Sequence, residues 1–300
     1  MDFQLLHPNF LDLEEEYSQL ETSKVVVVSL PYEATTTYGT GTRFGPEAII
    51  KASAHLETFD EELNLVPAQI GIATIQPDNI FSLAPEKFVQ KVADLTVYLL
   101  EQGKFVIGLG GEHTISVGLV EGFKRFYSDF WVLQLDAHSD LRYSYKSSRY
   151  NHACVMARIQ EKCAFVGVGI RSGILHEAKR LKEPSRIFYA HEMYENSNWP
   201  QEVLKILGEK VYITIDLDFF DPAIMPSVGT PEPGGFGWYD SLKFLKQVIR
   251  TKKVLGFDVV ELSPVSDLKA PDFMAAKLIY KLIGYIFEEE LSKRPKRNLD

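Results

Sequence analysis

The amino-acid sequence predicts an α/β protein in which a doubly wound, mostly parallel sheet carries helices on both faces. One observation is that apolar runs recur along the 300 residues and are mostly continuous and β-branched, a pattern typical of strands buried on both faces of a parallel sheet. A second is that helical patterns separate these runs, and such alternation gives a right-handed, doubly wound sheet. The expected strands are Val25 to Leu30, Phe105 to Leu109, Phe130 to Leu135, Ala164 to Val168, Val211 to Ile215 and Val254 to Val260.

The spacing of apolar residues places three helices between or after these strands. The first contains apolar residues from Phe88 to Leu99 at three- and four-residue spacing, with Pro85 near its start and Gly103 just after its end. The second follows Asp240, a candidate N-cap. The third is expected to cover Phe273 to Phe287.

Length and composition favour one domain over residues 1–300, because 45% apolar residues suffice for a substantial core. Within it, residues 288–300 are expected to form a helix end and a charged tail. The formal charge of −9 and the pI near 5.4 argue against nucleic acid as a partner, since phosphate-binding proteins normally carry a basic surface. Such a charge suits a small cationic substrate better.

The cysteines and the N-terminus indicate a cytoplasmic protein. Cys154 and Cys163 have no metal or redox spacing, so we expect two buried thiols in a reducing compartment. The segment from Met1 to Glu21 lacks a basic start followed by an apolar stretch, so no signal peptide is expected. The apolar runs are far shorter than the ~20 residues of a membrane span. We therefore expect no association with a membrane.

Residues of the kinds that bind metals follow three of the expected strands. Asp136, His138 and Asp140 occupy alternate positions after one strand, so an extended segment turns them toward one point. Asp216 and Asp218 do the same after another strand. Because the carboxyl ends of parallel strands share one edge of the sheet, we expect these side chains to converge there. The candidate metal ligands are His113, Asp136, His138, Asp140, Asp216 and Asp218.

The number and type of these ligands favour a two-metal centre. Two imidazoles and four carboxylates are too many for one structural zinc, whose closed sites are four-coordinate and rich in Cys and His. Ions of manganese-like hardness fit an oxygen-rich set better. The alternative is a solvated turn with a capping aspartate. Against it, crowded buried carboxylates repel one another unless cations compensate their charge.

A series of motifs in this order resembles the ureohydrolase family, of which arginase and agmatinase are the best-known members. Two further segments look more like agmatinase than arginase: GTRFGPEAI from Gly41 and GTPEPGG from Gly229. The resemblance therefore covers nearly the whole chain. The motifs of the series are GGEH from Gly110, DAHSD from Asp136, NHAC from Asn151, DLDFFDP from Asp216 and VVELSP from Val259.

The resemblance implies an arginase-like sheet with two Mn²⁺ ions per chain, which hydrolyses a guanidinium group to an amine and urea. By resemblance, Asp136 and Asp216 bridge the ions, His113 and Asp140 complete one site, and His138 and Asp218 complete the other. Two such ions, roughly 3.5 Å apart, share a water and lower its pKa, so that a hydroxide attacks the guanidinium carbon.

Two more residues receive catalytic and substrate-binding roles by resemblance. His152 is the proton carrier or the histidine that orients the substrate, rather than a ligand. Glu261 pairs with the guanidinium, because a carboxylate accepts two parallel N–H bonds from that planar cation. Arg171 is a candidate for orienting a loop at the rim. Asp258 is expected to be a buried hydrogen-bonding residue without a catalytic role.

The sequence leaves the substrate open. Agmatine is favoured, but Arg142, Lys146 and Arg149, in the loop of residues 141–150, are candidates to bind a carboxylate. Guanidinobutyrase, arginase and formimidoylglutamase activities are therefore alternatives. Two further alternatives are a metal-stabilised regulatory homologue without turnover and a single-zinc deacetylase. Family resemblance also suggests a homo-trimer or homo-hexamer.

Overall fold

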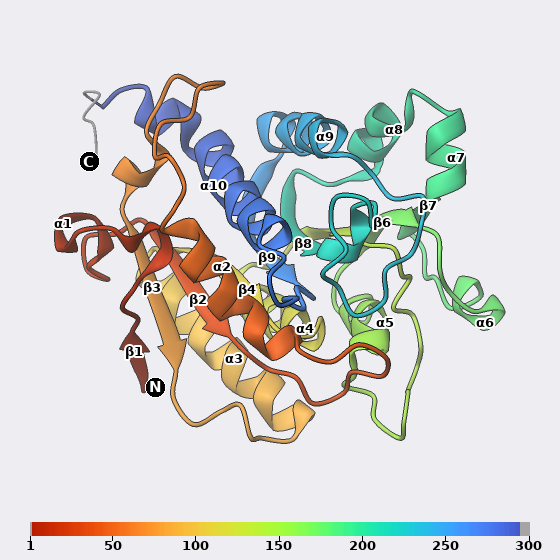
Figure 1. Cartoon of the computed structure of the whole chain (residues 1–300). Helices are drawn as coiled ribbons and strands as arrows, with labels where there is room; N and C mark the ends of the chain where they lie inside the picture. The colour runs from red at the N-terminus through yellow and green to blue at the C-terminus, as the bar shows by residue number, and fades with distance from the viewer. Residues whose placement is uncertain (1, 295–300) are drawn as a thin grey trace.

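The computed structural model describes residues 2–294, which form a central sheet of nine strands (Figure 1). The strands are β1 (Phe3–Leu5), β2 (Val25–Leu30), β3 (Ile72–Pro77), β4 (Phe105–Gly110), β5 (Trp131–Leu135), β6 (Phe165–Ile170), β7 (Arg186–Tyr189), β8 (Lys210–Asp216) and β9 (Lys253–Val260). Their order in the sheet is β1-β3-β2-β4-β9-β8-β5-β6-β7. All neighbouring pairs are parallel except β1 with β3. The predicted α/β fold with a mostly parallel sheet is confirmed.

Helices cover both faces of this sheet. Figure 1 shows α2 and α10 side by side in front of it, and α10 also contacts α9. On the other face α3 packs against α4, which in turn contacts α5. The helices are α1 (Glu15–Ser18), α2 (Gly45–Ser53), α3 (Pro85–Glu101), α4 (Thr114–Phe126), α5 (Val155–Ile159), α6 (Leu175–Ala178), α7 (Ala190–Glu195), α8 (Trp199–Ile206), α9 (Trp238–Thr251) and α10 (Ala270–Leu291).

The core has two layers, one on each face of the sheet, and β2 shows why the strands read as continuous apolar runs. Val25 and Val27 belong to the layer formed with α2 and α10, whereas Val26 and Val28 belong to the layer formed with α3 and α4. All four valines are buried. Successive side chains of a strand point to opposite faces, so a strand covered on both sides needs apolar residues at every position.

The three predicted helices are present as α3, α9 and α10. In α3 the predicted apolar face from Phe88 to Leu99 is buried, and Gly103 after its end has the left-handed φ of 70°. The N-cap of α9 is Gly237, so the expectation that Asp240 caps this helix is wrong. Asp240 lies in the first turn instead, where a carboxylate is favourable beside the positive end of the helix dipole.

The last helix begins earlier than the predicted Phe273. It starts three residues before Phe273 because Pro271 is well suited to the first helical turn. Residues 288–291 still belong to α10, whereas residues 295–300 of the predicted tail lie outside the described part of the chain.

Two other expectations concern thiols and membranes. Cys154 and Cys163 are both free and buried, as predicted. Among residues 2–294, no helix combines the length and the apolar character needed to cross a bilayer.

Candidate metal centre

The candidate ligands follow strands that lie close together in the sheet. His113 follows β4 and directly precedes α4, residues 136–140 follow β5, and Asp216 is the last residue of β8. The segment β4-β9-β8-β5 of the strand order places these strand ends along one edge. Five of the six side chains are at least nine-tenths buried, and His138 is the most exposed at 25%.

The convergence does not come from strand alternation. The prediction that an extended segment turns Asp136, His138 and Asp140 toward one point is wrong. Strand β5 ends at Leu135, and residues 136–140 form a loop in which Asp140 has a φ of 51°. Asp136 accepts a hydrogen bond from the backbone N–H of His138 at 2.5 Å, which closes a tight turn. The loop thus turns the side chains inward, whereas a strand would alternate them across a sheet.

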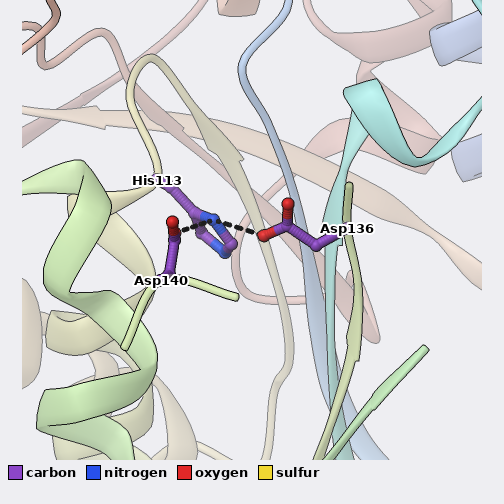
Figure 2. A group of neighbouring side chains, drawn as sticks. All are labelled: His113, Asp136 and Asp140. Carbon is purple, nitrogen blue, oxygen red and sulfur yellow. Dashed lines mark ion pairs between the residues drawn. The ribbon is translucent and has the colours of Figure 1, made fainter. Parts of the chain in front are cut away.

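The first group of ligand atoms surrounds the imidazole of His113. Its Nδ1 atom lies 3.3 Å from Asp136 Oδ2, 3.1 Å from Asp140 Oδ2 and 3.4 Å from Asp216 Oδ2. Figure 2 shows His113, on the loop after β4, between the carboxylates of Asp136 and Asp140. These atoms come from three separate strand ends, so only the assembled sheet brings them together.

The second group lies beside the first and shares Asp136 with it. His138 Nδ1 is 2.8 Å from Asp218 Oδ2 and 3.8 Å from Asp136 Oδ1. Ligand atoms of Asp136, His138 and Asp218 all lie within 4.8 Å of one another, as do those of His113, Asp136 and Asp140. Asp136 therefore presents one oxygen to each group.

The electrostatics of this cluster fit bound cations. Burial and the neighbouring Asp218 and Asp140 carboxylates raise the pKa of Asp136 to about 7. Burial also raises the pKa of Asp216 well above its ordinary value. Burial opposes protonation of His138, yet the Asp218 carboxylate raises the pKa of His138 to about 11. Each shift relieves the repulsion of crowded carboxylates by holding protons, and divalent cations serve the same purpose better.

The hydrogen bonds of His113 leave its Nδ1 atom suited to a metal. Nδ1 is buried and has no hydrogen-bond partner, whereas Nε2 lies 2.9 Å from Thr214 Oγ1. Thr214 donates its single proton to Asp258 Oδ1 at 2.7 Å, so its oxygen accepts from His113 Nε2–H. With a metal bound, the imidazole would be neutral and would direct the lone pair of Nδ1 into the cluster, as in metal-binding histidines held by a second partner.

Asp258 has the structural role predicted for it. Its side chain is fully buried and accepts hydrogen bonds from the hydroxyl groups of Thr214, Ser116 and Tyr212, the last at 2.6 Å. These bonds satisfy a charge that would otherwise be costly inside the protein. They also hold Thr214 in place against His113.

A cavity of about 360 Å³ opens over the cluster and is lined by the two residues with predicted roles beyond the metals, His152 and Glu261. Glu261 follows β9, and its Oε1 accepts from the backbone N–H of His113 at 2.6 Å. Burial raises the pKa of Glu261 to about 8. A cation that binds in the cavity therefore stabilises the ionised form of the Glu261 carboxyl group by pairing with it.

His152, which also lines the cavity, begins the short 3-10 helix η4 (His152–Cys154). Its Nδ1 atom lies 3.0 Å from Thr35 Oγ1, and Tyr145 packs against it edge to face. Burial lowers the pKa of His152, so the neutral imidazole is favoured.

Arg171 connects two loops, one of which carries the candidate ligand Asp218. Its guanidinium donates to the backbone carbonyl oxygens of Asp218 at 2.6 Å and Glu232 at 2.9 Å. The loop after β8 and the loop that contains Glu232 are therefore held together by one side chain. The orienting role of Arg171 stays a prediction.

The fold and the cluster together define a class of protein, a metal-dependent hydrolase built on a parallel α/β sheet. The chain belongs to the arginase family, whose family model matches residues 23–284. The resemblance to ureohydrolases, and to agmatinase in particular, is thus confirmed. Members of this family depend on a binuclear metal centre, and the chain is a metal-dependent amidinohydrolase.

Individual relatives agree with this assignment. The chain is 43% identical to an N(1)-aminopropylagmatine ureohydrolase of Synechocystis over 95% of both proteins. It is 32% identical to an agmatinase of Pyrococcus horikoshii, over 91% of this chain and 95% of the relative. The crystal structure of an agmatine ureohydrolase of Thermoplasma volcanium has a TM-score of 0.83 and 30% identity, and the match covers 92% and 94% of the two chains.

Some residues of the site were not singled out in the sequence. Thr35 and Glu112 contact the His152 side of the cavity, and Thr214 supports His113. Glu112 is part of the GGEH motif, so its position beside a candidate ligand was the one available signal. The two threonines lie in a loop and in a strand whose sequences give no indication of a site.

Proposed function

We propose that this chain is a binuclear-manganese hydrolase that releases urea from agmatine or from a derivative with an intact agmatine unit. The observation that supports this most is the shared position of Asp136, which presents one oxygen to each of two ligand groups. Imidazoles with many carboxylates suit a hard divalent ion such as manganese. One ion would be held by His113, Asp136, Asp140 and Asp216, and the other by Asp136, His138, Asp216 and Asp218.

The reaction adds water to the guanidinium carbon and breaks its bond to the alkyl nitrogen. When bound, the two ions supply Lewis acidity and an activated water. Glu261 orients the planar cation: Oε1 is engaged by His113, and Oε2 remains to accept an N–H of the substrate. The alkyl nitrogen leaves as an amine once it gains a proton, and urea remains.

His152 is proposed to carry that proton. It lines the cavity, and its lowered pKa leaves the ring neutral near neutral pH, so it can accept the proton that the attacking water releases and pass it to the departing alkyl nitrogen. Replacement by alanine should lower kcat by roughly 10² to 10⁴, the usual contribution of a general acid or base. Metal content should not change, because His152 has no contact with the ligand groups.

Urea release and elemental analysis of His152→Ala test this role together. His191→Ala is the matched control, since His191 is an exposed histidine on α7. Loss of metal from the His152 variant would show that the ligand assignment is misplaced, and unchanged kcat would remove its role.

Two of the bases in the loop of residues 141–150 already have acidic partners, which supports a substrate without a carboxylate. Arg142 lies 3.2 Å from Glu177, and Arg149 lies 2.9 Å from Glu161. A substrate carboxylate would have to displace one of these acids in order to pair with either arginine. An uncharged or cationic tail, as in agmatine, needs no such exchange.

The aminopropyl derivative of agmatine is a second candidate, favoured by the name of the 43% identical relative. A panel of agmatine, N1-aminopropylagmatine, arginine, guanidinobutyrate and formimidoylglutamate, scored by urea or formamide release, tests both. We expect the two agmatine-type substrates to exceed the acids in kcat/KM by roughly 100-fold, the cost of an unmatched buried charge. Preferred turnover of an acid would overturn the substrate assignment.

The resemblance to ureohydrolases also supports a homo-trimer or homo-hexamer and a cytoplasmic location. Sedimentation velocity on the manganese-loaded protein tests the assembly, and a monomer would contradict it.

A further inference from the structure

The hydroxyl group of Thr35 meets both His152 and Glu112. Thr35 Oγ1 lies 2.8 Å from Glu112 Oε1, 3.0 Å from the backbone nitrogen of His152 and 3.0 Å from His152 Nδ1. Residues 35, 112 and 152 come from three distant parts of the sequence. One oxygen atom therefore joins the loop after β2, the turn after β4 and the start of η4.

Glu112 is held so that it accepts hydrogen bonds. Its side chain is fully buried, and Oε2 accepts the backbone N–H groups of Ala34 at 2.8 Å and Thr35 at 2.6 Å. The backbone N–H of Glu112 donates in turn to the carbonyl oxygen of Tyr32 at 2.8 Å. A Cβ atom at Gly111 would lie only 2.2 Å from that same oxygen, so the close contact of the two segments requires this glycine.

The protons at Thr35 can be counted. A threonine hydroxyl has one proton to donate and two lone pairs with which to accept. The proton goes to the carboxylate of Glu112, and one lone pair takes the backbone N–H of His152. The second lone pair faces His152 Nδ1, so this nitrogen is the one that carries the ring proton.

We propose that Thr35 and Glu112 are positioning residues that hold His152 in the Nδ1–H form, so that Nε2 exchanges the proton with the substrate. This inference rests on the proposed role of His152. In neutral imidazole only one nitrogen is protonated, so a proton fixed on Nδ1 leaves a lone pair on Nε2. Nε2 makes no hydrogen bond to residues 2–294, and the ring lines the cavity.

Another histidine of the cavity, His113, has the same arrangement with its nitrogens exchanged. His113 directs Nε2 to Thr214, which donates to Asp258, and thereby frees Nδ1 for the metal cluster. His152 directs Nδ1 to Thr35, which donates to Glu112, and frees Nε2 for the cavity. A threonine between a histidine and a buried carboxylate thus determines in each case which nitrogen reacts.

The kinetic test compares Thr35→Val with Thr35→Ser. Valine keeps the shape but removes the hydroxyl, so kcat should fall roughly 10- to 100-fold, as when other orienting partners are lost. KM and metal content should stay near the wild-type values, and serine should restore kcat. Thr96→Val is the control, because it removes a buried hydroxyl that donates to Val92 O at 2.8 Å in α3, away from the cavity.

Wild-type kcat in Thr35→Val would overturn the proposal. An equal fall in kcat in the serine variant would also overturn it, as would a rise in KM with kcat unchanged. Either result indicates that Thr35 has a structural role and does not affect the position of the ring proton of His152.

Neutron diffraction from deuterated crystals of the manganese-loaded wild-type protein gives a reading independent of turnover. We expect a deuteron on His152 Nδ1 and none on Glu112. A deuteron on Nε2, with Thr35 donating to Nδ1, would contradict the inference. If no guanidino compound is hydrolysed, the proposed function fails. The position of this deuteron still decides whether Thr35 and Glu112 determine which ring nitrogen of His152 is protonated.

Discussion

Asp136→Asn is expected to abolish turnover and to lower metal content below two ions per chain. Asp136 Oδ2 lies 3.3 Å from His113 Nδ1, and Oδ1 lies 3.8 Å from His138 Nδ1, so this carboxylate serves both ligand groups. Asparagine keeps the shape but lacks the second anionic oxygen. Because metal ions contribute several kcal/mol to such reactions, we expect a loss of at least about 10³-fold.

Elemental analysis after dialysis, together with urea release at saturating substrate, measures both effects. Asp94→Asn is the matched control, since Asp94 is a half-exposed carboxylate on α3 that pairs with Arg125 at 2.8 Å. It should retain both metal and activity. An Asp136 variant with two ions and wild-type turnover would contradict the shared-ligand assignment.

Glu261→Gln is expected to weaken the binding of the guanidinium group more than it affects the metals. In the wild-type protein the backbone N–H of His113 donates to Oε1 of Glu261 at 2.6 Å, and glutamine keeps an oxygen that can accept this bond. It removes the negative charge with which the substrate pairs. Loss of a buried charge partner costs roughly 100-fold or more in affinity. The loss should therefore appear in KM, with metal content unchanged.

Steady-state kinetics on agmatine and isothermal titration with a guanidinium compound that is not hydrolysed test this prediction. Glu232→Gln is a useful comparison, because Glu232 is a partly exposed carboxylate 3.8 Å from His138 Nε2 that has no role in the proposed reaction. Unchanged KM in Glu261→Gln would exclude the pairing.

The sequence predicted the strands that are buried on both faces, because these consist mostly of apolar residues with at most one polar residue in each run. It did not predict β1, β3 and β7. Strand β3 is interrupted by Thr74, whose buried hydroxyl accepts the backbone N–H of Phe10 at 2.8 Å. Strands β1 and β7 lie at the two edges of the sheet and have only three and four residues, too short for a periodic pattern.

The site could be predicted in composition but not in geometry. Metal-binding residue types at strand ends indicated a shared edge, yet the loop of residues 136–140 converges through a tight turn and the positive φ of Asp140. Such backbone geometry leaves no mark in a pattern of polar residues. The contact of Thr35 with Glu112 and His152 spans 77 and 117 residues, so it exists only in the folded chain.

Anomalous diffraction at the manganese edge, from crystals grown with Mn²⁺, tests whether the chain holds two metal ions that share a carboxylate. We predict two peaks roughly 3.5 to 4 Å apart, with a carboxylate of Asp136 between them. His113 should ligate one ion and His138 the other. A single ion, such as one tightly held zinc, or two ions that share no carboxylate would contradict the binuclear centre.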